Sequence, residues 1–192
     1  MSKKTLWQRL GRLFNPGPKL PKHAQKQAVV RQFAKKYGTP YLVETGTCHG
    51  DMVAAMQKEF KKIISIELSE PFYREVCERF KGVANVELIH GDSGKELPKI
   101  VARLDAPALF WLDGHYSGGD TARGVTDTPV NEELHAIFQP DGLQHIVLID
   151  DARCFGTHPA YPTIEQIRQL VATVRPGWQV EVAGDCIRIF PT

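Results

Sequence analysis

Acidic residues end a series of apolar segments in this sequence. Five such segments are followed by Glu44, Glu67, Asp92, Asp113 and the pair Asp150-Asp151. Carboxylates in such places accept hydrogen bonds from a ligand, balance a positive charge or coordinate a divalent cation. A single acid would carry little information, because Asp is common in turns. Five in succession predict one shared ligand-binding edge, with common exposure to solvent as the simpler alternative.

The first acid opens a glycine-containing turn, which runs from Glu44 to Gly50 with the sequence Glu-Thr-Gly-Thr-Cys-His-Gly. Gly46 and Gly50 would let the backbone approach a ligand closely. The turn does not match the Gly-x-Gly-x-x-Gly pattern, and no Walker lysine follows it. Glu44 would repel a pyrophosphate but suits a ligand that carries an ammonium and a sulfonium. This favours S-adenosylmethionine over NAD or a nucleoside triphosphate.

The next two acids fit the rest of such a ligand. Glu67 ends the second apolar segment, where an acid can accept hydrogen bonds from both ribose hydroxyls. Asp92 ends the third segment, where it can accept a hydrogen bond from an adenine amino group, with Ser93 beside it.

Short apolar strands alternate with helical segments along most of the chain. The expected strands are 41–43, 62–67, 86–90, 108–112 and 145–149. The expected helices are 52–60, 71–80, 94–103, 129–138 and one within 161–174, and a hairpin of 178–183 and 186–190 closes the chain. This order predicts an α/β fold: a Rossmann-like, doubly wound, mostly parallel sheet with a C-terminal antiparallel hairpin. Right-handed crossovers then place the acids on one edge of the sheet.

The ordered motifs resemble those of the class I S-adenosylmethionine-dependent methyltransferases over about residues 41–190. The first motif is similar to the variant found in catechol-type and macrolide-sugar O-methyltransferases. The resemblance implies that the first turn holds the methionine moiety, that Glu67 binds ribose and that Asp92 and Ser93 face adenine. The implied cofactor-binding set is Glu44, Thr45, Gly46, Thr47, Gly50, Glu67, Asp92, Ser93 and Asp113.

The resemblance also implies a metal site. In metal-dependent O-methyltransferases, an acid after the fourth strand and an acidic pair after the fifth hold a divalent ion. Asp113, Asp150 and Asp151 occupy those places here. Oxygen ligands of this kind suit Mg²⁺ or Mn²⁺. The alternative is a structural acid pair that caps the next segment, or an acidic cluster whose positive charge comes from Arg153 or Arg123.

A catalytic base is implied by the sugar-modifying relatives, in which a histidine within Asp-Gly-Ser-His takes that role. Here the run is Asp113-Gly114-His115-Tyr116, which is one residue shorter. His115 is the first candidate for the base, and Asp113 or the acidic pair is the alternative. The glycine-containing segment that follows, 114–128, predicts a lid over the substrate.

The first 40 residues differ in charge from the rest. They carry ten Lys or Arg and no Asp or Glu, whereas the remaining 152 residues carry 14 basic and 22 acidic side chains (14 − 22 = −8). We divide the chain into a basic helical N-terminal extension, residues 1–40, and an S-adenosylmethionine-binding methyltransferase domain, residues 41–192. The extension contains an amphipathic segment, 3–14, and a second basic helix, about 21–37. Three roles are open for this extension: it packs on the folded domain, lies peripherally on an anionic membrane, or binds nucleic acid. The acidic charge of residues 41–192 argues against nucleic acid.

Composition excludes several other classes of protein. No run of about 18 apolar residues exists that would span a membrane, and the first residues do not resemble a secretory signal. The four cysteines are scattered without a Cys-x-x-Cys pair, which argues against a zinc site and a disulfide framework. Reduced thiols in a cytoplasmic protein are the expectation.

The expected reaction is methyl transfer from S-adenosylmethionine to an oxygen of a small molecule or sugar, with or without a divalent metal. A first alternative keeps the cofactor and changes the acceptor to a nitrogen, an RNA or a protein. A second is an oxidoreductase that uses NAD or a nucleotide sugar on the same fold, and a third is a ligand-binding module without catalysis.

Overall fold

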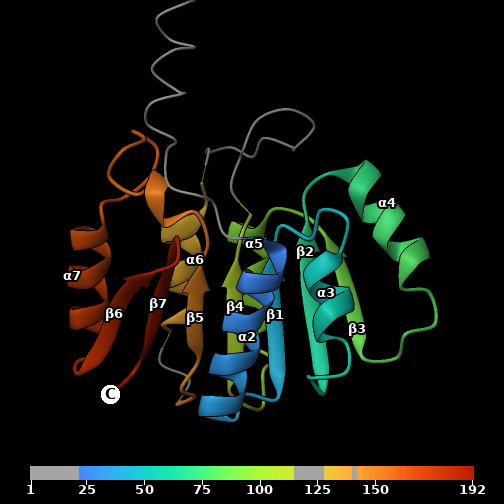
Figure 1. Ribbon diagram of the computed structural model, residues 1–192, viewed down its shortest axis with the longest axis horizontal. Helices are drawn as coiled ribbons and strands as arrows, with labels where there is room; N and C mark the ends of the chain where they lie inside the picture. The colour runs from blue at the N-terminus through green and yellow to red at the C-terminus, as the bar shows by residue number, and fades with distance from the viewer. Residues whose placement is uncertain (1–21, 115–127, 140–141) are drawn as a thin grey trace, which may run out of the picture.

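The fold is built on one seven-stranded sheet, seen in a computed structural model that describes residues 22–114, 128–139 and 142–192. The strand order is β3-β2-β1-β4-β5-β7-β6 (Figure 1). The strands are β1 (Tyr41–Thr45), β2 (Lys62–Glu67), β3 (Val86–His90), β4 (Ala108–Leu112), β5 (Ile146–Ile149), β6 (Trp178–Ala183) and β7 (Cys186–Pro191). The first five are parallel to one another, and β7 is antiparallel to both β5 and β6. The predicted fold class is therefore confirmed.

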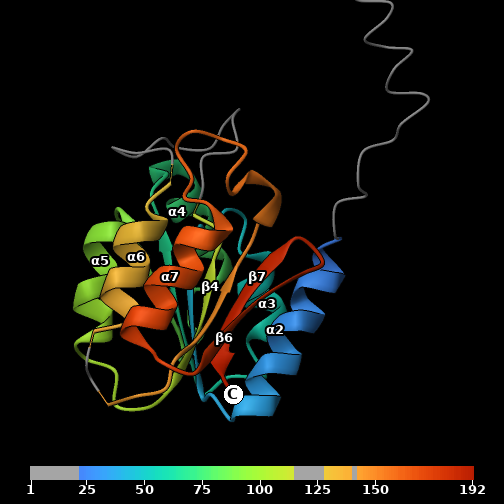
Figure 2. The same ribbon diagram turned by 90° about the vertical axis from the view of Figure 1, so that its left-hand side faces the viewer.

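The helices connect these strands and cover the sheet on both faces (Figure 2). They are α2 (His23–Tyr37), α3 (Asp51–Met56), α4 (Glu70–Arg79), α5 (Ser93–Val101), α6 (Val130–Ile137) and α7 (Ile164–Val174), with a short 3₁₀ turn η1 at Ala152–Cys154. Every strand and helix expected within the described residues is present. The largest difference is α3, which ends at Met56 instead of residue 60. Helix α7 lies within the expected range and begins after the Thr163 capping box.

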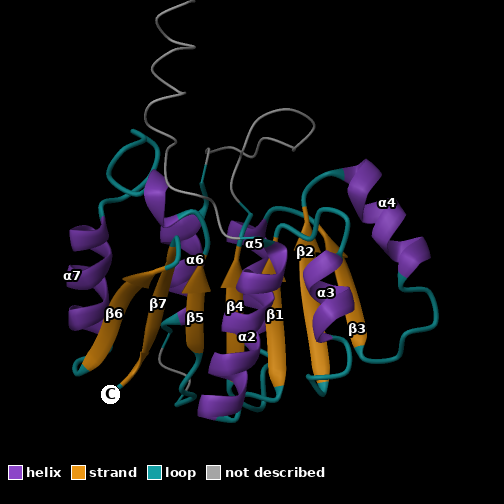
Figure 3. Cartoon of the chain, in the orientation of Figure 1, coloured by secondary structure: helices purple, strands orange, loops and turns teal. Residues whose placement is uncertain are grey.

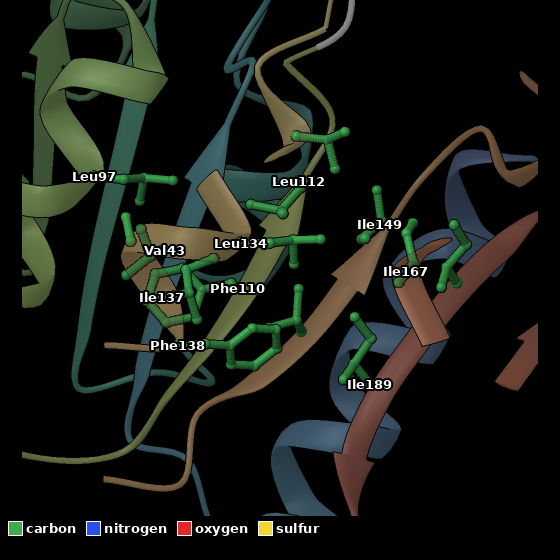
Figure 4. Packing of buried hydrophobic residues seen from close by; sticks show 14 of the residues in the cluster. Val43, Leu97, Phe110, Leu112, Leu134, Ile137, Phe138, Ile149, Ile167 and Ile189 are labelled. Atoms are coloured by element: carbon green, nitrogen blue, oxygen red, sulfur yellow. The ribbon is translucent and has the colours of Figure 1, made fainter. Parts of the chain in front are cut away.

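Two hydrophobic cores lie on opposite faces of the sheet, because alternate residues of each strand point to opposite sides. On one face, α5, α6 and α7 pack on the strands, and Figure 4 shows Leu134 and Ile167 close to Phe110 and Ile149. On the other face, buried side chains of α2, α3 and α4 meet strand residues such as Leu42. Fully burying one such aliphatic side chain contributes about 1.5–3 kcal/mol, so both layers stabilise the sheet.

Helix α2 belongs to the second core although its sequence is basic. Its residues Val30 and Phe33 are buried, and the ring centroid of Phe33 lies 5.4 Å from that of Phe190 in β7. Three roles were considered for the basic N-terminal segment, and its described part, helix α2, packs on the core. Residues 3–14, with their predicted membrane contact, lie outside the described residues.

Two further features of the described residues bear on the expectations above. None of their helices is both long and apolar enough to cross a lipid bilayer. The four cysteines are free thiols.

Candidate active site

The five parallel strands end at one edge of the sheet (Figure 3), and the predicted acids lie at or just after these strand ends. The strand ends are in register, since Thr45 of β1 pairs with Ile66 of β2 on one side and with Leu112 of β4 on the other. Glu44 lies inside β1, whereas it was expected just after a strand that ended at residue 43, and Glu67 is the last residue of β2, as expected. Pairing continues this far because Gly46 N–H still donates to Ile66 C=O at 2.9 Å.

The turn after β1 is shaped by backbone conformations that favour glycine. Gly46, Cys48 and Gly50 have φ angles of 81°, 49° and 77°. A Cβ atom on Gly46 would lie 2.5 Å from the backbone oxygen of Asp113, and one on Gly50 would lie 2.6 Å from the Phe80 ring. Both glycines therefore allow close approach to the protein itself, which differs from their predicted role of close approach to a ligand. At Gly46 the consequence is that the β1 and β4 loops touch.

Glu67 is held rigidly at the end of β2. Its Oε2 accepts a hydrogen bond from Cys48 N–H at 2.7 Å, and its Oε1 accepts one from Ser69 N–H at 2.7 Å. A carboxylate oxygen can accept two hydrogen bonds, so each oxygen keeps capacity for a ligand hydroxyl. Glu67 is 7% exposed, and its arrangement fits the predicted ribose acceptor.

Glu44 lies beneath the same turn in a chain of hydroxyl groups. Ser65 Oγ donates to Glu44 Oε2 at 2.6 Å, and Thr47 Oγ1 lies 2.6 Å from Ser65 Oγ. Because Ser65 uses its only proton on Glu44, Thr47 must donate to Ser65. Burial raises the pKa of Glu44 to about 8, the Ser65 hydrogen bond opposes this rise, and the nearby charge of Glu67 adds to it. A ligand cation near Glu44 would favour its charged form.

Asp92 and Ser93 begin α5 after the third strand. Asp92 is the N-cap, and its Oδ1 accepts a hydrogen bond from Gly94 N–H at 3.0 Å. Capping of this kind satisfies a free amide of the first helical turn. Ser93 is buried. The structure thus places both residues at the predicted edge, and it gives Asp92 a structural duty besides the predicted contact with adenine.

Asp113 and Asp150 share a cation that the sequence analysis did not single out. Lys26, in the second turn of α2, donates a hydrogen bond to Asp150 Oδ2, and its Nζ lies 3.9 Å from Asp113 Oδ2. Burial by itself lowers the pKa of Lys26, but the charge of Asp113 and the contacts with Asp150 outweigh it, so the pKa is raised. The pKa of Asp113 is raised by burial and by the charge of Asp150, against the effect of Lys26. Lys26 is therefore a permanent cation at this edge.

Asp151 pairs with a different cation. Its backbone is left-handed with φ 57°, and its Oδ1 accepts a hydrogen bond from Arg153 at 2.8 Å. The same guanidinium group pairs with Asp185 in the β6–β7 turn. Arg153 was one of the expected alternative sources of positive charge, and it pairs with Asp151. Arg123 lies outside the described residues.

The three predicted metal ligands do not fit a divalent ion in this arrangement. Lys26 occupies one oxygen of Asp150, and Arg153 occupies Asp151. The other oxygen of Asp150 is buried, with no hydrogen-bond partner among the described residues. Within residues 22–114, 128–139 and 142–192, no three His, Cys, Asp or Glu side chains form a group suited to a metal.

Glu133 is a buried acid of this region that the sequence analysis missed. It lies in α6 with no exposed surface, and neither of its oxygens makes a hydrogen bond of good geometry to a described residue. Burial raises its pKa to about 7, although the nearby hydroxyls of Ser93 and Thr45 lower it in part. The signal in the sequence was its place within the apolar stripe Val130, Glu133, Leu134 and Ile137.

His115 and most of the predicted lid, 114–128, lie outside the described residues. The described part of that segment begins with Gly114, where an added Cβ would lie 3.1 Å from Thr45 Oγ1. The start of the segment is thus packed against the end of β1, next to the first turn.

Comparison with known proteins finds methyltransferases among those that are similar to this chain. No family model matches the chain. It is 37% identical over 67 residues to a protein of Methanosarcina barkeri described as "probable ribosomal RNA small subunit methyltransferase A". The matched segment covers 33% of this chain and 23% of that protein. It is 25% identical over 105 residues to ribosomal RNA small subunit methyltransferase A of Dehalococcoides mccartyi, or 55% of this chain and 34% of that protein. The chain thus spans about a third or less of these relatives.

Solved structures match over far more of the chain. The O-methyltransferase TomG from Streptomyces achromogenes, in complex with S-adenosylmethionine and involved in tomaymycin synthesis, superposes with a TM-score of 0.64 and 14% identity. The match covers 100% of this chain and 91% of TomG. Other similar structures include an O-methyltransferase from Bacillus cereus and the 23S rRNA methyltransferase ErmE. The chain therefore has the fold found in class I S-adenosylmethionine-dependent methyltransferases.

Proposed function

We propose that the chain transfers a methyl group from S-adenosylmethionine to an oxygen of a small molecule or sugar. The observation that carries the proposal is the Glu67 carboxylate, fixed by two backbone N–H groups beside the turn after β1. An acid at this place can bind a ribose diol in an NAD enzyme as well. Glu44 separates the two cofactors, because a buried carboxylate under the turn favours a cationic ligand over a pyrophosphate.

Each residue of the edge has a role in this proposal. The turn from Thr45 to Gly50, with Glu44 beneath it, would hold the methionine moiety, Glu67 the ribose, and Asp92 with Ser93 the adenine. S-adenosylmethionine supplies a methyl group on a positively charged sulfur, and its transfer leaves a neutral thioether. The protein gains rate chiefly by fixing the acceptor oxygen in line with that methyl group.

The acceptor proton needs a base at the same edge. The side chain of Asp113 is 34% exposed, whereas that of Asp150 is 1% exposed and already bound to Lys26. Asp113 is therefore the acid that an acceptor can reach, and it can take the proton as the acceptor oxygen bonds to the methyl group. His115 remains the other candidate base.

Two observations bear on the acceptor. The superposition on TomG, an O-methyltransferase, extends over the whole chain and supports a small acceptor, although the 23S rRNA methyltransferase ErmE also superposes over 91% of the chain. The local identity to ribosomal RNA methyltransferases supports RNA as a second candidate. That identity covers at most 55% of the chain, and in this fold such a segment can record the cofactor site alone.

The experiment is methyl transfer from labelled S-adenosylmethionine to a panel of catechols, other phenols and sugars, with ribosomal RNA as a separate arm. We expect label in a small acceptor and none in RNA. If only RNA is labelled, the proposed acceptor is wrong and RNA takes its place, whereas the proposal that the cofactor is S-adenosylmethionine still stands. The variants Asp113→Asn and His115→Ala identify the base, and Glu78→Gln, an exposed acid of α4, is the matched control.

A further inference from the structure

We propose that Lys26 takes the place of a divalent metal at the active-site edge, as the fixed counter-ion of Asp113 and Asp150. One consequence of this proposal, that methyl transfer needs no Mg²⁺ or Mn²⁺, rests on the proposed function. The occupancy of the acid pair can be tested without any methyl acceptor.

The place of Lys26 follows from the packing of α2. Lys26, Val30 and Phe33 are spaced by four and three residues, so they share one face of the helix. Val30 and Phe33 are buried against the sheet, and this directs Lys26 to the same side. Helix α2 begins at the edge where the parallel strands end (Figure 1), which brings the Lys26 ammonium to Asp113 and Asp150.

Charge explains why a cation is needed there. Asp150 directly follows β5 and Asp113 directly follows β4, and these strands are hydrogen-bonded neighbours. Two carboxylates so close repel each other in a buried site unless a positive charge lies between them. Lys26 supplies this charge with its own side chain only 20% exposed, so the pair is already balanced before any ligand arrives.

The same contacts exclude a metal. A divalent ion must take its oxygen ligands at distances of about 2.0–2.6 Å, but the Lys26 ammonium already holds Asp150 Oδ2, and Asp150 Oδ1 is buried away from the surface. Asp151, the third expected ligand, is held by Arg153 and cannot compensate. Lys26 is therefore a positioning residue: it fixes the acid pair, and Asp113 stays open toward the acceptor.

The test measures Mn²⁺ binding by electron paramagnetic resonance on the full chain. In the Lys26→Met variant the stem remains but the charge is lost, so the two carboxylates become free to bind a metal. We expect Lys26→Met to bind one Mn²⁺ at least about tenfold more tightly than the unchanged protein, a difference of about 1.4 kcal/mol. Adding Asp150→Asn to Lys26→Met should remove the gained site.

Three controls keep the test decisive. Lys35→Met removes an exposed lysine of the same helix and should leave Mn²⁺ binding unchanged. Lys26→Arg keeps the charge and should gain no site. If Lys26→Met fails to fold, Asp150→Asn in the otherwise unchanged protein decides, because it should not alter Mn²⁺ binding.

Two results would overturn the proposal. One is tight Mn²⁺ binding by the unchanged protein that Asp150→Asn weakens, and the other is a folded Lys26→Met that binds Mn²⁺ no better than its parent. Failure of the cofactor assignment would appear elsewhere, as absent binding of S-adenosylhomocysteine, and would leave these metal measurements unaffected.

Discussion

The backbone N–H of Cys48 donates a hydrogen bond of 2.7 Å to Glu67 Oε2, and this bond ties the turn after β1 to the end of β2. Cys48 can donate in that direction because its φ angle is 49°, in the left-handed region. One carboxylate thus shapes the turn and, in our account, binds the ribose.

Replacing Glu67 tests both roles. Glu67→Ala removes the acceptor of two backbone N–H groups and of the ligand hydroxyls, and each unpaired buried group costs about 1–3 kcal/mol. We expect calorimetry to show affinity for S-adenosylhomocysteine reduced by about one to two orders of magnitude, with a lower melting temperature. Glu78→Ala, an exposed acid of α4, should change neither quantity. Unchanged affinity in Glu67→Ala would remove Glu67 from the site.

Binding of the cofactor should release a proton from Glu44. The pKa of this buried carboxyl group is about 8 without ligand, so at pH 7 it is mostly protonated. A nearby ligand cation lowers that pKa, and Glu44 then ionises on binding. We expect affinity to rise with pH between about 6 and 8, and calorimetry in buffers of different ionisation enthalpy to count up to one proton released. Glu44→Gln should abolish the pH dependence, and a dependence that persists in Glu44→Gln would assign the proton to another group.

Glu133 should reduce stability as the pH rises. Its pKa of about 7 in the folded state exceeds its ordinary value of 4.5, so the folded state holds the proton more tightly than the unfolded state. The free energy of unfolding therefore falls between about pH 4.5 and 7, by on the order of 3 kcal/mol at most.

The Glu133→Gln variant should lose this fall, because it cannot ionise and its amide can bond to the hydroxyls of Ser93 and Thr45. Urea unfolding at pH 5 and pH 8 measures the effect, and the exposed neighbour Glu132→Gln is the control. Equal stability of Glu133→Gln and the unchanged protein at pH 8 would contradict this reading.

Gly46 should tolerate no side chain. Gly46→Ala places a Cβ 2.5 Å from the Asp113 backbone oxygen, which adds an overpacking cost of about 1–3 kcal/mol to a left-handed backbone cost of about 1–2 kcal/mol. Gly38→Ala is the matched control, since Gly38 has φ 62° with no atom within 4 Å of the added Cβ. Thermal unfolding should show a clearly larger loss for Gly46→Ala. Equal losses would mean that the contact between the two loops is unimportant.

The strands and their acidic ends could be predicted because each carboxylate follows a local apolar run, and such runs need no knowledge of distant contacts. Lys26 could not be placed in this way. Its partner Asp150 is 124 residues away in sequence. Lys26 is one of ten basic residues among the first 40, and charge alone does not distinguish it from the other nine. The available signal was that Lys26 shares a helix face with Val30 and Phe33, which a charged residue does only when its charge is satisfied.

The positions of the acids after β5 could be predicted, but not their directions. Asp150 and Asp151 are adjacent, yet Asp150 turns to Lys26 and Asp151 turns to Arg153. Asp151 also has a left-handed backbone, with a φ angle of 57°, and no residue type in the sequence demands that conformation. The expectation of a common metal therefore rested on the positions of the acids and left out the two cations that pair with them.

Titration of the unchanged protein with S-adenosylhomocysteine, NADH and ATP, by calorimetry at pH 7.5, tests the central claim most directly. The account predicts one S-adenosylhomocysteine bound per chain, with NADH and ATP binding far more weakly, because a cationic ligand stabilises the ionised form of Glu44 whereas a pyrophosphate or triphosphate opposes that form. Binding of NADH or ATP in preference to S-adenosylhomocysteine would contradict the account.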